Sequence, residues 1–237
     1  MMESFKKSLT QHAIAIGLFL LVALLYSYPV LQGNKLAAGD TIHWMAMSQE
    51  ARAWYEKTGE NPLWSNSMFG GMPTFTTYTQ GKTNLVYIIQ DVLMHVIPNP
   101  AFFFFIAMLC FYILAQAWKL NKWVSIIGAI AFAFASYNLQ IIVAGHNTKM
   151  ISIALMPLVV AGMNWVYQGR FLLGAGVSLL GLSLLISNGM YQIDYYLMII
   201  LAGFGIGYFI EALQSNKLKE FFIASGIMLG VAALSIG

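Results

Sequence analysis

Charge and cysteine are both scarce in this chain. Asp, Glu, Lys and Arg make up 9% of the 237 residues, whereas 59% of the residues are hydrophobic. The mean hydropathy is +0.71. Soluble domains carry about 25% charged residues, so the composition excludes an ordinary soluble domain. It predicts a membrane protein.

Other absences exclude further classes of protein. The single cysteine, Cys110, lies in an apolar segment and allows neither an intrachain disulfide nor a thiolate metal cluster. The net charge is +3, but the basic residues are scattered and predict no nucleic-acid-binding face. The sequence contains no phosphate-cradling Gly-Lys-Ser/Thr loop, zinc motif or nucleophile elbow.

Apolar runs long enough to cross a membrane fill most of the chain, since a transmembrane helix takes about 17–25 residues. We predict an all-α polytopic membrane protein with about seven transmembrane helices, forming a single domain over residues 1–237. Lys6 and Lys7 precede the first run and no prompt cleavage site follows, which indicates an uncleaved signal anchor. The last run stays apolar to Gly237, so we expect the chain to be the N-terminal part of a longer protein. The predicted spans are residues 13–31, 100–118, 123–143, 150–167, 171–187, 194–213 and 221–237.

Basic residues in the short connections predict the orientation of these spans. Cytoplasmic loops carry an excess of Lys and Arg. The short connections on the side away from the N-terminus carry only Lys149. We therefore predict a cytoplasmic N-terminus. The connections on the N-terminal side carry Lys6, Lys7, Lys119, Lys122, Arg170, Lys217 and Lys219.

The long loop after the first span, residues 32–98, is then extracytoplasmic. Its apolar residues recur at helical spacing over 42–57 and again over 84–97, which predicts two amphipathic helices at the membrane surface. Gly70 and Gly71 indicate a tight turn between them, or a place where the backbone approaches a ligand. Trp64 and Phe69 suit either stacking on a sugar or anchoring in lipid headgroups.

Asp40 is the candidate catalytic residue. It follows the first span closely, so its carboxylate is expected near the outer membrane surface, where it would accept a proton from a substrate hydroxyl or orient that hydroxyl. The alternative is structural, because Asp before a helix is a favoured N-cap. Asp40 and His43 are also spaced to share a helical face, and a divalent metal held there with Asp194 or His146 is a lesser alternative.

Two short outer connections carry further polar residues. His146, Asn147, Thr148 and Lys149 precede the fourth span, where Asn147 or Thr148 would cap the helix and the whole group would favour a phosphate. The alternative to a phosphate site is an ordinary capped hairpin in which Lys149 lies at the membrane interface. In the other connection, Asp194 is expected to meet Lys149 or Asp40 across a shared outer vestibule, or else to lie in a solvated hairpin.

Two patterns predict packing rather than chemistry. The spacings Gly203-x-x-x-Gly207 and Gly226-x-x-x-Gly230 predict close helix packing. The run 102–105, four consecutive phenylalanines, is expected to face lipid.

Five short strings stand out along the chain: Gly39-Asp40, residues 61–64 (NPLW), 68–73 (MFGGMP), 145–149 (GHNTK) and Gln192-Ile193-x-Tyr195-Tyr196. Together they resemble the YfhO family of bacterial membrane proteins, in the version found in Bacteroidetes-type bacteria. The resemblance runs over essentially the whole chain. One departure is that Gly189-Met190-Tyr191 replaces a turn where the family commonly has a histidine.

The YfhO family is similar to GT-C glycosyltransferases, which transfer a sugar from a polyprenyl-phosphate donor to an envelope glycan or lipid acceptor outside the cytoplasm. The resemblance implies a multi-pass protein of the bacterial inner membrane that contacts membrane lipid, with no certain cofactor and with a possible membrane complex. It implies Asp40 as the catalytic residue and residues 146–149 as the phosphate site. A non-catalytic membrane subunit, or a lipid or polymer transporter, is the alternative. The implied sugar or acceptor pocket comprises His43, Trp64, Gly70, Gly71, Gln192, Asp194 and Tyr195.

Overall fold

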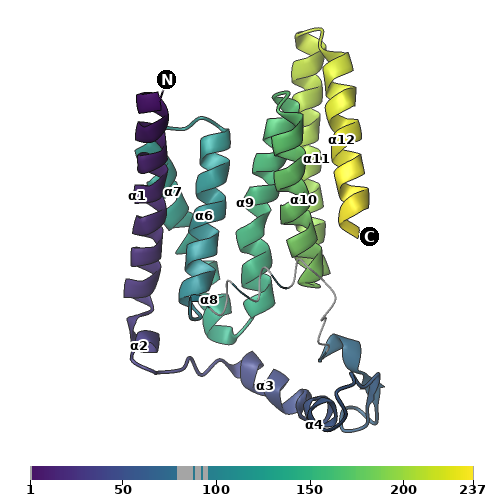
Figure 1. The fold of residues 1–237 in the computed structure, drawn as a ribbon. Helices are drawn as coiled ribbons and strands as arrows, with labels where there is room; N and C mark the ends of the chain where they lie inside the picture. Colours follow the sequence, from purple (N-terminus) through teal and green to yellow (C-terminus); the bar gives the residue numbers. More distant parts are fainter. Residues whose placement is uncertain (1, 79–87, 89–91, 93–95, 237) are drawn as a thin grey trace.

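Long apolar helices stand side by side, with a small polar substructure at one end (Figure 1). The computed structural model describes residues 2–78, 88, 92 and 96–236. The bundle helices are α1 (Met2–Tyr26), α6 (Ala101–Ala117), α7 (Lys122–Ala133), α8 (Ser136–Ala144), α9 (Asn147–Tyr167), α10 (Phe171–Ser187), α11 (Tyr191–Gln214) and α12 (Leu218–Ile236).

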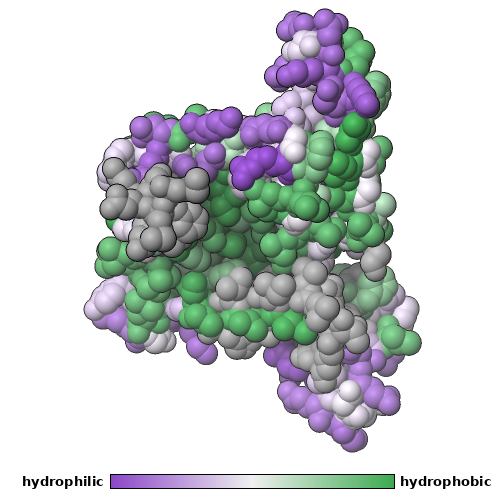
Figure 2. Space-filling model, turned by 45° about the horizontal axis from the view of Figure 1, so that its top comes forward, coloured by the Kyte–Doolittle hydropathy of each residue, from purple (hydrophilic) through white to green (hydrophobic). Residues whose placement is uncertain are grey.

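Among the described residues, four helical segments are long and apolar enough to cross a membrane: Lys122–Ala144, Asn147–Tyr167, Tyr191–Gln214 and Leu218–Ile236. Figure 2 shows apolar residues forming a band between polar ends. These observations confirm the prediction of an all-α membrane protein. The number of about seven transmembrane helices stays a prediction. The shorter apolar helices in the bundle are Thr10–Tyr26, Ala101–Ala117 and Phe171–Ser187.

The predicted span 123–143 is broken near its middle. The helix stops at Ala133 and restarts at Ser136. The buried Asn138 donates its side-chain amide to the carbonyl of Phe132 at 2.8 Å and to that of Ala133 at 3.4 Å. In lipid an unpaired carbonyl is costly, so Asn138 makes the break tolerable inside the bundle.

The closest helix packing joins α9 to α10, and it differs from the prediction. A Cβ at Gly174 would lie 2.6 Å from the carbonyl oxygen of Gly162 and 2.6 Å from the amide of Val166, so the two backbones approach closely here. Around Gly203, Gly207, Gly226 and Gly230 the described residues leave open space, so the close packing that those spacings permit is not made within the described part of the chain.

The surroundings of the phenylalanine run also differ from the prediction. Phe102, Phe103 and Phe104 are only 1–3% exposed, so the expectation that they face lipid is wrong. They begin α6, which packs against α1, α7 and α9. One of them, Phe104, stacks on Phe134 with ring centroids 4.6 Å apart, at the break between α7 and α8.

The described part of the loop after α1 lies below the bundle in the view of Figure 1. The predicted helix 42–57 is two helices, because the chain turns at the buried Ser48. The second predicted amphipathic helix, 84–97, lies largely outside the described residues. The loop elements are α2 (Tyr28–Leu31), α3 (Gly39–Met47), α4 (Gln49–Thr58), the antiparallel strands β1 (Trp64–Ser65) and β2 (Met72–Pro73), and the 3-10 helix η1 (Thr74–Thr76).

Candidate functional site

An acidic and an imidazole side chain from distant parts of the chain meet at the loop end of the bundle. Asp40 lies in the first turn of α3, and His146 lies between α8 and α9. Oδ2 of Asp40 is 2.9 Å from Nδ1 of His146, a hydrogen-bonding distance. The Asp40 side chain is 53% exposed and that of His146 is 41% exposed, so a solute can reach both. We refer to these residues as the Asp40–His146 pair.

Gly145 allows the two segments to come together. It ends α8 in the left-handed region at φ 99°, and its N–H and that of His146 both donate to the carbonyl of Ile141. A Cβ at Gly145 would lie 2.9 Å from both the backbone nitrogen and Oγ1 of Thr41, the residue after Asp40. The absence of a side chain therefore lets the α8–α9 turn contact the start of α3.

Asp40 does not cap its helix, so that part of the structural alternative is wrong. Ala38 occupies the N-cap position of α3, without a side-chain cap bond, and Asp40 lies inside the first turn. A carboxylate in the first turn is still favoured by the helix dipole. The carboxylate is directed to His146 instead of to its own backbone amides.

The start of α9 also differs from the prediction. His146 occupies the N-cap position, and no side chain caps the helix, so the expectation that Asn147 or Thr148 is the cap is wrong. Thr148 is exposed and Lys149 is half-buried in the first turn. Within the described part of the chain, no hydrogen bond or ion pair joins Lys149 to another side chain. Lys149 lies three residues after His146, in the first turn of α9, and so adds a positive charge to that turn.

Glu50 holds the loop together, a role that sequence reasoning missed. Its carboxylate accepts from the hydroxyl of Ser65 at 2.7 Å and from the backbone amides of Asn66 and Ser67, at 3.1 and 2.8 Å to the same oxygen. Hydrogen bonds from the Ser67 and Ser65 hydroxyls, then from these amides, lower the pKa of Glu50 to about 2. In the sequence, Glu50 resembles any charged residue on the polar face of an amphipathic helix.

Trp64, Gly70 and Gly71 build a hairpin. Trp64 pairs with Pro73 across β1 and β2, and the turn passes through Gly70 at φ 78° and Gly71 at φ 121°. A Cβ at Gly71 would lie 2.6 Å from Nε1 of Trp64, so the indole rests on a bare backbone. The tight-turn reading of the two glycines is confirmed. The Trp64 side chain stays 54% exposed, which leaves it available to a ligand.

Four further residues were predicted to line the sugar or acceptor pocket. His43 is exposed on α3. Gln192 donates to the hydroxyl of Tyr196 at 2.8 Å, and Tyr195 is 64% exposed. Asp194 lines an apolar cavity of about 440 Å³ among α9, α10, α11 and α12. Within the described residues, no hydrogen bond or ion pair joins Asp194 to the Asp40–His146 pair or to Lys149.

Among the residues that the structure describes, no group of three or more His, Cys, Asp or Glu side chains could hold a metal ion. The alternative in which Asp40 and His43 bind a divalent ion with a third residue therefore has no geometry to support it there.

Comparison of the chain with protein-family models, with characterised proteins and with solved structures found no match.

Proposed function

We propose that this chain is a membrane glycosyltransferase that transfers a sugar from a polyprenyl-phosphate donor to an envelope glycan or lipid acceptor on the extracytoplasmic side. The observation that carries the proposal is the hydrogen-bonded Asp40–His146 pair, exposed at the loop end of an apolar helical bundle. The resemblance to the YfhO family and the GT-C class supplies the donor and acceptor classes.

The reaction needs a base for the acceptor and a place for the departing phosphate. The acceptor hydroxyl oxygen forms a bond to the anomeric carbon, and the bond from that carbon to the phosphate oxygen breaks. The phosphate leaves with the electron pair. The hydroxyl proton passes to the enzyme, and the anomeric configuration inverts.

In this proposal His146 takes the proton and Asp40 positions it. When the Asp40 carboxylate accepts a hydrogen bond from Nδ1–H of His146, the other ring nitrogen, Nε2, is left as a proton acceptor. The carboxylate also stabilises the imidazolium that forms. This assigns to Asp40 a positioning role, whereas the sequence favoured Asp40 as the base itself.

The leaving phosphate is proposed to lie against the first turn of α9. Lys149 adds a full positive charge there, and free backbone amides at a helix start favour an anion. Fixed positive groups that meet developing negative charge lower the barrier without reorganisation. Thr148 and Asn147 in the same turn supply further donors.

The proposed orientation places the pair outside a bacterial inner membrane. The turns α6–α7, α9–α10 and α11–α12 lie at the same end of the bundle as the N-terminus, opposite to the loop (Figure 1). These turns carry Lys119, Lys122, Arg170 and Lys217. An excess of basic residues is typical of cytoplasmic connections. This supports a cytoplasmic N-terminus.

The test is complementation of a strain that lacks the gene, with envelope glycans compared by mass spectrometry. His146→Gln is expected to abolish the glycan that the wild-type chain restores, because removal of a positioned proton acceptor costs about 10²–10⁴-fold. Asp40→Asn is expected to reduce that glycan strongly as well, because it removes the charge that orients His146 and stabilises the imidazolium. Glu56→Gln, an exposed carboxylate on α4, is the matched control and should restore it. Normal glycans from Asp40→Asn at wild-type protein level would refute catalysis and favour a transporter or a non-catalytic subunit.

A further inference from the structure

An apolar cavity of about 440 Å³ lies among α9, α10, α11 and α12. Within the described part of the chain, Asp194 is the one charged residue in its lining. Asp194 lies in the first turn of α11, just after the α10–α11 turn at the loop end of the bundle (Figure 1). The cavity therefore has an apolar body and an acidic end. The apolar lining includes Met163, Leu182, Leu185, Leu197, Leu201 and Met228.

Asp194 is also the polar side chain of this lining that the fold leaves without a partner. At the opposite end of the cavity, the hydroxyls of Tyr167 and Ser225 are 2.9 Å apart, a hydrogen-bonding distance. The hydroxyl of Ser235 donates to the carbonyl of Ala232 at 2.8 Å. Oδ1 of Asp194, in contrast, is buried and has no hydrogen-bond partner among the described residues. A buried carboxylate oxygen without a donor is unfavourable, so this site lacks one donor.

The dimensions of the cavity fit one hydrocarbon chain. Along α11 its lining runs from Asp194 to Gly205, which is about 16 Å at the helical rise per residue. This length is about half of the roughly 30 Å hydrocarbon core of a bilayer, and so matches one leaflet. The mean cross-section is then about 27 Å², whereas a helix about 10 Å across needs about 80 Å². A hydrocarbon chain, which contacts its neighbours at about 4 Å, needs roughly 15–20 Å².

The carboxylate determines which head group this chain carries. An ionised carboxylate only accepts hydrogen bonds, and an ammonium offers three donors together with the opposite charge. A phosphate at the same place would meet a like charge. In an ethanolamine phospholipid the phosphate lies between the chains and the ammonium, so it would bring a negative charge to Asp194 first. The ligand that fits is therefore an amine joined directly to its chain.

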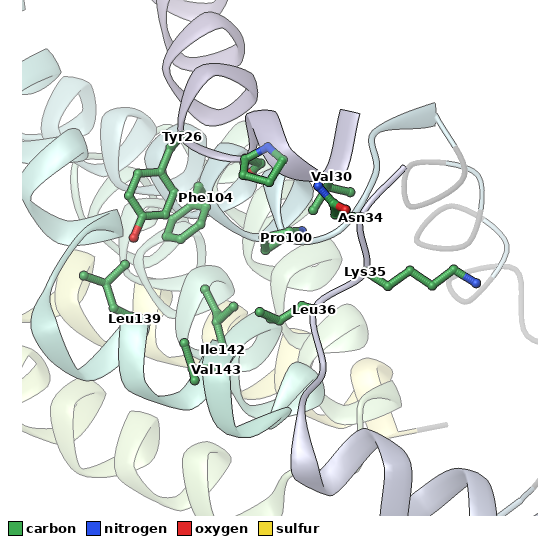
Figure 3. A pocket seen from close by; sticks show the side chains of 12 residues that line it. Tyr26, Val30, Asn34, Lys35, Leu36, Pro100, Phe104, Leu139, Ile142 and Val143 are labelled. Atoms are coloured by element: carbon green, nitrogen blue, oxygen red, sulfur yellow. The ribbon is translucent and has the colours of Figure 1, made fainter. Parts of the chain in front are cut away.

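A second apolar hollow, of about 290 Å³, does not select a head group in this way. It opens at the loop end of the bundle, between α2, the start of α6, and α8 (Figure 3). Lys35 is the one charged residue in its described lining, and Figure 3 shows the Lys35 side chain extending away from the apolar side chains. No charged group therefore faces an occupant there.

We propose that the cavity at Asp194 binds a single-chain lipid amine from the leaflet on the loop side of the membrane. The ammonium donates to Oδ1 of Asp194, and the chain lies among α10, α11 and α12. The inference does not depend on the proposed sugar transfer. It assigns to the chain a second ligand site, which admits a cationic amphiphile and disfavours a lipid phosphate.

The experiment uses the full chain in detergent, incubated with tetradecylamine, tetradecanol or tetradecyl phosphate, and measures the retained amphiphile by native mass spectrometry. The three probes share one chain, so a difference between them reports the head group. The wild type should retain the amine about tenfold more than the alcohol, because of the charge-assisted hydrogen bond, and the phosphate least. Asp194→Asn should retain amine and alcohol equally. Glu220→Gln, an exposed carboxylate outside this lining, is the matched control and should keep the preference for the amine.

A second pair of variants tests the cavity itself. Ala232→Trp fills it from α12 and should lower retention of the amine about tenfold, whereas Ala233→Trp, at an exposed position outside the lining, should not. Gly205→Leu fills the same cavity from α11 and replaces Ala232→Trp if thermal unfolding shows that variant to be unfolded. Wild-type retention by a folded filling variant overturns the cavity as the site. Equal retention of amine and alcohol by the wild type, or a preference that survives Asp194→Asn, overturns the assignment of the head group.

Discussion

Replacement of Gly145 by alanine should separate the two members of the Asp40–His146 pair. The new Cβ would lie 2.9 Å from the Thr41 nitrogen, whereas ordinary contact begins at 3.4 Å, so α3 and the α8–α9 turn must part by about 0.5 Å. Oδ2 of Asp40 and Nδ1 of His146 are 2.9 Å apart in the wild type. The same shift would take this distance beyond the usual hydrogen-bonding range of about 2.7–3.2 Å.

Two costs are expected from this change. A left-handed conformation costs a non-glycine residue about 1–2 kcal/mol, which corresponds to a fall of roughly 2–8 °C in Tm for a chain of this size. The displacement should lower transfer activity on the order of tenfold, since a misplacement of about 1 Å costs roughly 100-fold.

Gly169→Ala is the matched control. Gly169 also has a positive φ, of 81°, but it lies in the α9–α10 turn with nothing within 4 Å of its hypothetical Cβ. It should show a similar fall in Tm with normal glycans. The assay is thermal unfolding of both purified variants, together with envelope glycan mass spectrometry after complementation. If Gly145→Ala restores glycans as well as Gly169→Ala does, the contact at Thr41 does not set the geometry of the site.

Three further changes test the scaffold. Gly174→Ala should lower Tm through overpacking of about 1–3 kcal/mol, whereas Gly176→Ala, with open space in the same helix, should leave Tm unchanged or slightly raised. Asn138→Leu should cost about 1–3 kcal/mol, because the carbonyls of Phe132 and Ala133 both lose a side-chain donor and Phe132 keeps only the 3.3 Å bond from the Ala135 amide; thermal unfolding measures this loss. Glu50, with a pKa of about 2 against an ordinary 4.5, stabilises the loop fully above pH 4.5 and loses this effect as the pH falls toward 2. The protection factor of the Ser67 amide, which compares its exchange rate with that of an unprotected amide at the same pH, should fall through that transition in the wild type. In Glu50→Gln it should be low at every pH.

The coarse architecture was predictable because a bilayer leaves few choices to an apolar chain. Runs without charge specify helices, and the predicted bounds of the span over 171–187 match α10 residue for residue. Burial inside the bundle was not predictable. Phe102–Phe104 face protein, yet Phe is equally favourable against lipid, so hydropathy cannot distinguish the two surroundings.

The residues of the candidate site were predictable from the sequence, but the contacts between them were not. Asp40 and His146 were both singled out from the sequence, but they were placed together only in the lesser alternative of a metal site, and Asp194 was expected to meet Lys149 or Asp40. The choice depends on Gly145, whose bare backbone decides which side chain of the α8–α9 turn faces α3. Glu50 was overlooked because its partners, Ser65 to Ser67, belong to a hairpin whose pairing is fixed by tertiary contacts.

The pair joins a segment made early in synthesis to one made much later. At about 5–20 residues per second, His146 leaves the ribosome on the order of 5–20 s after Asp40. During that interval the segment that carries Asp40 is already made, while the turn that supplies His146 is not. The Asp40–His146 pair can therefore form only after α8 and the start of α9 have been made and packed against α3.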